Sequence, residues 1–243
     1  MTTLVRITIA LILALFLSSC GFDINFGDFG SGKKGNGNVT SENREITSEF
    51  TEVSASEGLD VYVTQGDEFG ITVEADENII DLIATDIKND RLRIHAEENI
   101  GRATKKVFVT LPEIAALKSS SGAHLSTENM VNSDKLEIDG SSGANIQIEM
   151  NVSEVDIDAS SGANLNLSGD SQTMYVDASS GANINAKKLT SKVCHADASS
   201  GGNVSVYVSD DLTADASSGG NISYSGDANV TKKKSVSGSV HKN

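Results

Sequence analysis

The sequence is poor in proline and in aromatic residues. Its 243 residues include one Pro, no Trp, four Tyr and seven Phe, against 22 Gly. Ser and Asn are abundant, and Val and Ile recur in short alternating runs. This composition is typical of many short strands joined by tight corners, and it argues against a helical bundle. The lack of Trp also removes a side chain that is well suited to stacking on sugars.

Cationic residues are also scarce. The chain has 19 Lys and Arg against 34 Asp and Glu, which gives a formal net charge of −15. No basic patch large enough to offset that charge is visible, so nucleic acid is excluded as a partner. Removal of residues 1–19 as a signal peptide takes away Arg6 and no acidic residue, so the mature chain carries −16.

Only two cysteines are present, and the first ends an export signal. Arg6 is followed by an apolar run over residues 7–17, which is short for a transmembrane helix, and then by Leu-Ser-Ser-Cys at 17–20. This ending resembles a bacterial lipobox, in which the cysteine is diacylated and becomes the mature N-terminus. We therefore expect a signal peptide over 1–19, a lipid on Cys20 that inserts into a membrane, and an outer-membrane lipoprotein of the cell envelope. Which face of the membrane it occupies stays open.

The remaining chain divides by composition into three parts. Residues 20–45 are Gly-rich without a sustained period, which predicts a flexible tether. Residues 46–231 alternate between apolar and polar side chains and are expected to form the folded part. Residues 232–243 begin with three lysines and are rich in Ser, which predicts a solvated tail or a charged block on a strand edge.

A six-residue motif, Ser-Ser-Gly-(Ala/Gly)-(Asn/His)-(Ile/Leu/Val), occurs six times between Ser120 and Ile222. Its glycines are spaced by 21, 19, 19, 20 and 18 residues: Gly122, Gly143, Gly162, Gly181, Gly201 and Gly219. A nearly fixed period indicates stacked units. The positions seven and five before each glycine, and three and five after it, are apolar almost without exception, as in strands with one buried face. Cys194 falls in one of these inward columns and is expected to be a buried packing residue, with His195 facing outward.

Equivalent residues that recur once per unit require parallel coils. We predict an all-β fold, a right-handed parallel β-helix with coils of about 18–21 residues and regular repeats over 116–231. The corner glycine would supply a positive φ or relieve crowding between coils. Residues 53–61 parallel the later repeats, so we expect less regular coils over 50–115, with a small antiparallel cap as the alternative.

The outward columns are the candidate sites. Four residues before the corner glycines lie Asp139, Asp158, Asp177, Asp197 and Asp215, and two residues after them lie Asn145, Asn164, Asn183, Asn203 and Asn221. One interpretation has each Asp bonded to the following serines and the Asn amides in a ladder between coils. The other places Ca²⁺ between neighbouring aspartates, whose oxygens are suitable ligands. No other cofactor is indicated.

Parallel β-helices also host polysaccharide lyases and hydrolases, so an enzyme is the alternative function. All five arginines lie outside the marked repeats, at positions 6, 44, 91, 93 and 102. Repeated identical columns also differ from an active site, which is normally one unique constellation. We therefore predict no catalytic residues and a role in adhesion, binding or structure, with a glycan or an envelope protein as partner.

The Ser-Ser-Gly-Ala-Asn-Ile phrase, the stretch at 50–66 and Arg-Leu-Arg-Ile at 91–94 resemble the head GIN domain of autotransporter adhesins, found in exported proteins of Bacteroidetes. The resemblance covers roughly residues 45–225. It implies a β-solenoid at the cell envelope with an adhesive role, and it supplies no catalytic residues. The chain leaves no room for a C-terminal membrane barrel, so the lipid on Cys20 would be the anchor.

Overall fold

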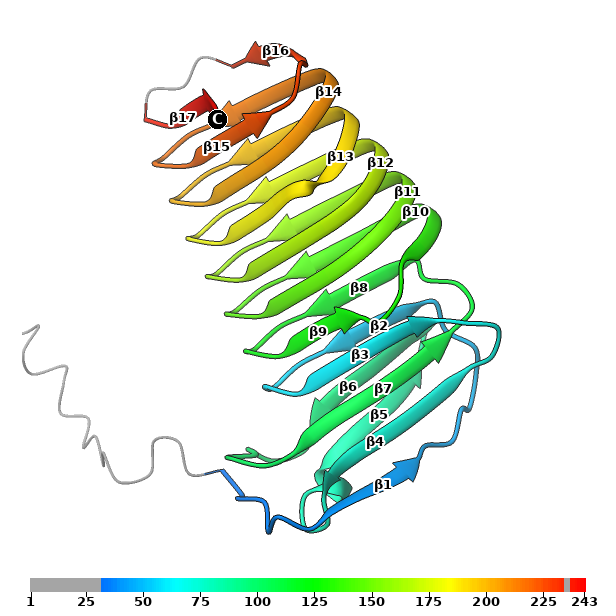
Figure 1. The fold of residues 1–243 in the computed structure, drawn as a ribbon. Coiled ribbons are helices and arrows are strands. Elements are labelled where there is room, and N and C mark those ends of the chain that lie inside the picture. The colour runs from blue at the N-terminus through cyan, green and yellow to red at the C-terminus, as the bar shows by residue number, and fades with distance from the viewer. Residues whose placement is uncertain (1–31, 234–236) are drawn as a thin grey trace, which may run out of the picture. The chain divides into compact units, whose positions relative to one another are not determined.

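The computed structural model describes residues 32–233 and 237–243, which form strands joined by short turns (Figure 1). The expected signal peptide and Cys20 lie outside these residues. The N-terminal elements are β1 (Val39–Asn43), β2 (Glu52–Ala55), β3 (Asp60–Gln65), β4 (Gly70–Asp76), the 3-10 turn η1 (Ile80–Leu82), β5 (Ile83–Lys88), β6 (Arg91–Ala96) and β7 (Lys105–Leu111). The later strands are β8 (Ala116–Ser119), β9 (His124–Thr127), β10 (Val131–Gly140), β11 (Asn145–Ala159), β12 (Asn164–Ala178), β13 (Asn183–Ala198), β14 (Asn203–Ala216), β15 (Asn221–Ser225), β16 (Asn229–Lys232) and β17 (Ser239–Lys242).

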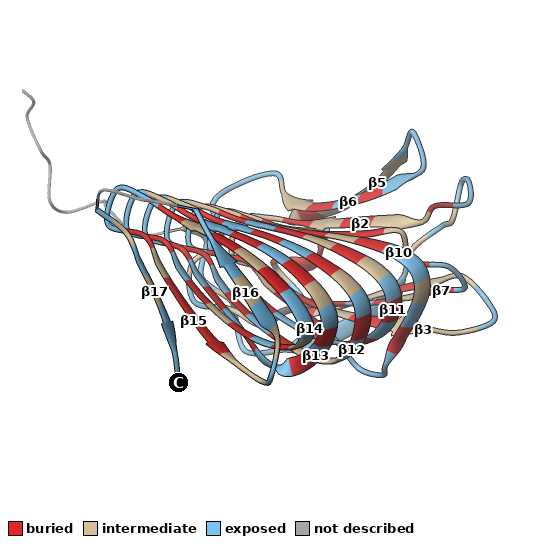
Figure 2. Ribbon diagram, turned by 90° about the horizontal axis from the view of Figure 1, so that it is seen from above, coloured by how far each residue is buried: buried red, intermediate tan, exposed pale blue. Residues whose placement is uncertain are grey.

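Each regular coil is one long strand that runs from one Ser-Ser-Gly corner to the next. Strands β11 to β14 pair in parallel, and buried and exposed residues alternate along them (Figure 2). The pairing places Cys194 in register with Met174 and Leu212, and its side chain is fully buried. The prediction of a parallel β-solenoid is thus confirmed, with about seven turns. The packing role of Cys194 is confirmed as well.

The corner is a tight turn with two left-handed residues. In the coil of Gly181, Ser180 has φ 51° and Gly181 has φ 74°, and the N–H of Ala182 donates to the carbonyl of Ser179 at 3.0 Å. These features define a type I′ turn. The N–H of Gly181 then donates to the carbonyl of Ser200 in the next coil at 3.2 Å. No atom lies within 4 Å of a Cβ built on Gly181, so this glycine is needed for its positive φ and not to relieve crowding.

The N-terminal strands form coils whose spatial order differs from their sequence order. Strands β2 and β3 meet at a corner formed by Glu57 and Gly58, with φ 61° and 69°. They pair in parallel with β8 and β9 on one side and with β6 and β7 on the other. The first coil is therefore enclosed between two later ones, and the expected degenerate early coil is present.

Antiparallel strands extend these coils at the edges of β6 and β7 that face away from β2 and β3. Strand β5 pairs antiparallel with β6, β4 with β7, and β1 with β4 (Figure 1). The N-terminal region thus combines both interpretations of the sequence, irregular parallel coils and an antiparallel cap. The cap arises because the chain returns through β4 and β5 before it forms the β6–β7 coil.

Residues 32–45 belong to this cap and differ from the expected flexible tether. Lys33 forms a parallel bridge with Ile100, and β1 lies along β4. The buried carboxylate of Asp76 accepts hydrogen bonds from the N–H groups of Gly37 at 2.5 Å and Thr104 at 2.6 Å. These bonds fasten the segment because a buried carboxylate needs such donors. Gly-rich composition alone does not reveal such partners.

The opposite end also differs from the expected boundary at residue 231. Strands β16 and β17 pair in parallel with β14 and β15 and add part of a further coil. Lys232 occupies the inward column next to Ala214. Its Nζ donates to the carbonyl of Val240 at 2.8 Å and lies 5.6 Å from the centre of the Tyr224 ring. A charged group in an apolar column discourages another chain from stacking on this edge.

No helix within residues 32–233 and 237–243 is long and apolar enough to cross a membrane.

Candidate binding faces

The outward surface of the sheet that precedes the corners is here called the acidic face. Strand pairing sets one aspartate per coil in register across it, in the order Asp139, Asp158, Asp177, Asp197 and Asp215. Adjacent strands lie about 4.8 Å apart, so neighbouring carboxylates repel. Lys118 occupies the same column at one end, and Nζ of Lys233 lies 3.5 Å from Oδ2 of Asp215 at the other. Among the residues that the structure describes, lysines thus stand at the two ends of the column.

The central carboxylates lack polar partners. Within the described residues, no hydrogen bond or ion pair involves the side chains of the first four aspartates of the column. Partial burial, followed by the charge of Asp156 and other nearby carboxylates, raises the pKa of Asp158. Burial, followed by the charge of Asp197, raises the pKa of Asp177. Both shifts have the sign expected for a carboxylate that gains no compensating donor.

The expected bonds from these aspartates to the following serines do not form. The backbone N–H of Ser160 donates instead to the carbonyl of Gly140 at 2.9 Å, and that of Ser179 donates to Ala159 at 2.9 Å. The parallel ladder between coils takes the donors that an Asx turn would need. That interpretation of the aspartate column was therefore wrong.

The outward surface of the sheet that follows the corners is here called the amide face. Its first column is Asn145, Asn164, Asn183, Asn203 and Asn221, in register from coil to coil. Three of these amides donate to the corner glycine carbonyl of their own coil, at 3.4 Å for Asn145, 3.3 Å for Asn164 and 3.1 Å for Asn203. The predicted ladder between coils in this column is therefore wrong. A hydrogen bond between side-chain amides of neighbouring coils occurs in the next column of the same face, where Nδ2 of Asn185 donates to Oδ1 of Asn166 at 3.1 Å.

Stacked aromatic rings add to both faces. On the acidic face, Tyr175 and His195 stack with ring centres 5.1 Å apart and planes 9° apart. On the amide face, Tyr62 stacks on Phe108 at 5.1 Å. Sequence reasoning placed His195 outward but missed its partner. Tyr175 and His195 lie six residues before their corner glycines, and this shared offset could have revealed the pair.

No group of three or more His, Cys, Asp or Glu side chains among the described residues is arranged to hold a metal ion. Burial raises the pKa of the Cys194 thiol to about 12, so the thiolate that would act as ligand or nucleophile is strongly disfavoured. The Cys194–His195 pair therefore has no reactive thiol at neutral pH.

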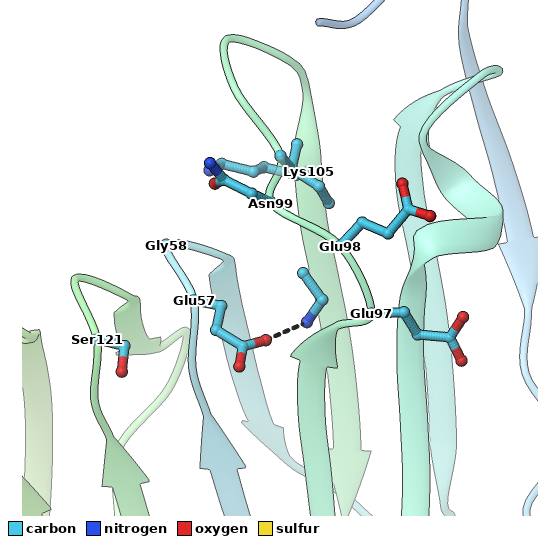
Figure 3. A pocket seen from close by; sticks show the side chains of 9 residues that line it. Glu57, Gly58, Glu97, Glu98, Asn99, Lys105 and Ser121 are labelled. Atoms are coloured by element: carbon cyan, nitrogen blue, oxygen red, sulfur yellow. Dashed lines mark hydrogen bonds between the residues drawn. The ribbon is translucent and has the colours of Figure 1, made fainter. Parts of the chain in front are cut away.

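A cleft of about 580 Å³ lies beside the irregular first corner (Figure 3). Glu57 stands there in the position that a serine takes in later corners, and Glu97, Glu98 and Lys105 line the opening. The carboxylate of Glu57 accepts the N–H of Ala96 at 2.7 Å. Glu57 thus fastens the end of β6 to the corner, which is a structural role.

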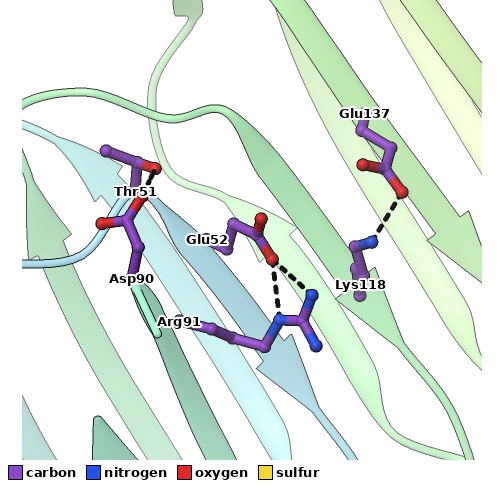
Figure 4. A network of polar contacts seen from close by, with 6 residues as sticks. All are labelled: Thr51, Glu52, Asp90, Arg91, Lys118 and Glu137. Carbon is purple, nitrogen blue, oxygen red and sulfur yellow. Dashed lines mark hydrogen bonds and ion pairs between the residues drawn. The ribbon is translucent and has the colours of Figure 1, made fainter. Parts of the chain in front are cut away.

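A second irregular place lies on the acidic face where the N-terminal coils meet the regular ones. Arg91 binds the carboxylate of Glu52 through Nε at 2.7 Å and Nη2 at 2.6 Å (Figure 4). On the neighbouring strands, Nζ of Lys118 binds Glu137 at 2.6 Å. These ion pairs hold two glutamates in fixed positions on either side of β8. A cleft of about 640 Å³ opens at this junction.

These features define the class of the protein as a parallel β-solenoid with repeated polar columns on two outward faces. The family model described as "Putative auto-transporter adhesin, head GIN domain" matches residues 49–228, so the chain belongs to that family. The predicted family resemblance is confirmed.

Solved structures share the same fold at low sequence identity. A putative adhesin from Bacteroides fragilis has a TM-score of 0.74 and 18% identity, with 86% of this chain and 99% of that chain covered. A putative adhesin from Parabacteroides distasonis has a TM-score of 0.69 and 20% identity, with 86% and 99% covered. A protein from the same species described as a putative lipid binding protein has a TM-score of 0.63 and 19% identity, with 86% and 98% covered. None of the curated proteins compared matches the chain.

Proposed function

We propose that this chain is a lipid-anchored protein of the cell envelope whose β-solenoid binds a partner without catalysing a reaction. The observation that carries the proposal is the exact register of polar side chains on the acidic and amide faces. Repeated columns present one chemistry many times along a rigid rod, which suits a partner with its own repeat. Membership of an adhesin family supports the same role.

The two faces offer different chemistry to such a partner. The amide face supplies neutral donors and acceptors, and the acidic face supplies carboxylates that lack partners in the described structure. Sugar hydroxyls can bond to both kinds of group, so a polysaccharide of the envelope or of a neighbouring cell is the partner class that we propose. A protein of the envelope is the alternative partner.

Binding and catalysis are separated by one experiment on the mature chain. The chain with Cys20→Ser, which cannot be lipidated, is immobilised and incubated with purified envelope polysaccharides, and the eluate is analysed by mass spectrometry. We expect retained polysaccharide of unchanged length. Shortened or unsaturated oligosaccharides would show a lyase or hydrolase instead.

The anchor is tested on cells. The unaltered chain is expected to incorporate a labelled fatty acid and to fractionate with the outer membrane, and Cys20→Ser is expected to lose both properties. Protease treatment of intact cells then reports which side of the membrane the solenoid occupies. A labelled Cys20→Ser chain would contradict the proposed anchor.

Calcium is not required by this proposal. A Ca²⁺ ion takes six to eight oxygen ligands, and two neighbouring aspartates supply fewer than that. We therefore expect the same Tm in EDTA and in millimolar Ca²⁺ when ionic strength is matched with Mg²⁺. A rise in Tm that is specific to Ca²⁺, and that Asp177→Asn reduces, would instead assign the ion to the aspartate column.

A further inference from the structure

Strand β13 is irregular in the middle of the amide face. From Asn185 to Lys188 the chain takes three residue steps, whereas the paired segment of β12, from Asn166 to Ser168, takes two. The additional residue matches the sequence, in which the spacing of the corner glycines rises from 19 to 20 residues at this coil. A β-bulge of this kind re-aims the side chains beside it and is frequent next to functional sites.

The bulge turns a lysine toward the outward surface. Within it the alternation of buried and exposed residues is interrupted, and two consecutive lysines, Lys187 and Lys188, are both exposed. Strands β11, β12 and β13 lie side by side, and their pairing puts Gln147, Asn166 and Asn185 in one column of side-chain amides (Figure 1). Lys188 therefore stands in the column next to these amides.

A cleft of about 270 Å³ opens between these side chains. It is lined by Gln147, Asn166, Leu167, Ser168, Asn185 and Lys188. Leu167 is buried, so a ligand meets the polar side chains. Lys188 is the one charged residue of this described lining, whereas acidic residues line the clefts beside the first corner and at the N-terminal junction. The cleft is smaller than the pockets of roughly 300–1,000 Å³ that enclose drug-sized ligands, so it suits a single sugar residue on an open surface.

Most of the hydrogen-bonding capacity of this lining is unused within the described structure. Nδ2 of Asn185 donates to Oδ1 of Asn166 at 3.1 Å. No hydrogen bond or ion pair with another described residue involves the side chains of Gln147, Ser168 or Lys188. The bond between the two asparagines orients both amides and leaves Oδ1 of Asn185 as an acceptor and Nδ2 of Asn166 as a donor. Oriented groups of this kind reduce the entropy lost when a ligand binds.

The charges around the cleft favour an anionic group despite the net charge of the protein. A carboxylate about 4 Å from the ammonium of Lys188 gains about fivefold in affinity, even in water. Two acidic residues lie further away and outside the lining, since Glu149 pairs with Ser168 on the side away from Lys188 and Asp170 follows along β12. At about 8–10 Å, each lowers the affinity only about twofold, and Lys187 offsets one of them. The aspartate column lies on the opposite outward face, and the spacing of about 10 Å between packed sheets exceeds the screening length of about 8 Å at physiological ionic strength.

We infer that this cleft, here called the bulge site, binds a sugar residue that carries a carboxylate, such as a uronic acid unit of an acidic polysaccharide. The carboxylate accepts a hydrogen bond from Nζ of Lys188, and the ring hydroxyls bond to the free amide groups of Gln147, Asn166 and Asn185. This inference rests on the proposed binding function and deepens it by naming the class of polysaccharide and one site for it.

The test is an NMR titration of the ¹⁵N-labelled mature chain with Cys20→Ser. The probes are methyl glucuronide, methyl glucoside as its neutral counterpart, and acetate as a carboxylate without a sugar ring, each at millimolar concentration and matched ionic strength. We expect methyl glucuronide to shift the side-chain amides of Gln147, Asn166 and Asn185, with a Kd at least about threefold lower than that of either comparison. Equally tight binding of acetate would reduce the site to a lysine that attracts any carboxylate, and would overturn the sugar assignment.

Three variants test the position of the site. Lys188→Gln removes the contacting charge and is expected to weaken binding of methyl glucuronide about fivefold while leaving methyl glucoside within about twofold. Lys192→Gln makes the same change at another exposed lysine of β13, outside the lining, and is expected to change either Kd by less than about 1.5-fold. Glu149→Gln removes a distant repulsion and is expected to tighten binding of methyl glucuronide about twofold.

None of these three side chains bonds to another described residue, so the variants are expected to fold like the unaltered chain. Equal effects of Lys188→Gln and Lys192→Gln would show that the overall charge attracts the ligand, and would overturn the bulge site.

The remaining outcomes separate this inference from the proposed function. Shifts confined to another column of the amide face, at Asn164 or Asn203, would overturn the bulge site and leave glycan binding intact. An equal Kd for methyl glucuronide and methyl glucoside would overturn the acidic class of the ligand. If no probe shifts any amide while the immobilised chain still retains polysaccharide, the bulge site is overturned and the proposed function stands. If the retention is absent as well, both are overturned.

Discussion

The acidic face and the amide face are built on the same backbone, yet their side chains are satisfied in opposite ways. On the amide face, Asn164 and Asn203 bond to carbonyls of their own corners, and Asn185 bonds to Asn166 in the next coil. On the acidic face, the pKa values of Asp158 and Asp177 are raised, and their carboxylates have no partner in the described residues. Parallel coils in register place identical side chains next to one another. Neighbouring amides can then form hydrogen bonds, whereas neighbouring carboxylates repel.

The largest expected effect on stability comes from the corner that joins the two faces. In Gly181→Val, a β-branched residue must adopt φ 74°, which L-residues rarely do. We expect the free energy of unfolding to fall by about 1–3 kcal/mol, with a lower Tm by thermal denaturation. Both faces should be affected, since the corner sets the position of Asp177 before it and of Asn183 after it.

The control is Ser180→Gly in the same corner. Ser180 already has φ 51°, so glycine relieves its strain and is expected to keep the Tm or raise it slightly. No heavy atom outside the neighbouring residues lies within 4 Å of a Cβ at position 181, so the first added atom meets no crowding. An unchanged Tm for Gly181→Val would show that the positive φ is not needed.

The next prediction concerns the acidic face alone. Replacing both Asp158 and Asp177 with Asn removes two repelling charges and keeps the shape of the side chains. At neutral pH and low salt we expect the free energy of unfolding to rise by up to about 1 kcal/mol, the scale of two exposed charges at 4 Å in water. Added salt should reduce the difference from the unaltered chain, because it screens the repulsion.

The same variant has a defined pH dependence. The folded-state pKa of each aspartate is raised above its ordinary value of 3.8. The folded state therefore binds more protons than the unfolded state just above that value, so stability from these groups is present below pH 3.8 and is lost as pH rises through the raised pKa. The advantage of the double Asn variant should thus shrink as pH falls from 7 toward 4, measured as the difference in Tm at each pH. A constant difference would contradict the raised pKa values.

The regular coils could be predicted from the sequence because their information is local and repeated. The offset from each corner glycine fixes which residues face inward, and Cys194 followed that rule. The partners of the Asp and Asn columns were not predictable in the same way. Ser160 and Ser179 each have one N–H, and the register between coils decides whether that donor is free.

The N-terminal region was less predictable for a topological reason. Strands β6 and β7 lie outside β2 and β3 although they follow them in sequence, so sequence order gives no guide to neighbours. Asp76 is a single buried carboxylate whose donors are backbone groups at Gly37 and Thr104, far away in the chain.

The smallest expected change in stability comes from a single side-chain hydrogen bond on the amide face. Asn185→Ala removes one exposed side-chain hydrogen bond to Asn166. Asn183→Ala removes an amide in the adjacent column that has no such hydrogen bond to any described residue. A net hydrogen bond contributes about 0.5–1.5 kcal/mol, and an exposed one lies at the low end because water replaces the partner. Asn185→Ala should therefore lower the free energy of unfolding by about 0.5 kcal/mol relative to Asn183→Ala, measured by urea denaturation. Equal stabilities would mean that water replaces the Asn185–Asn166 hydrogen bond without loss of stability. The side-chain amides of this face would then be available to a ligand, as the aspartates of the acidic face are.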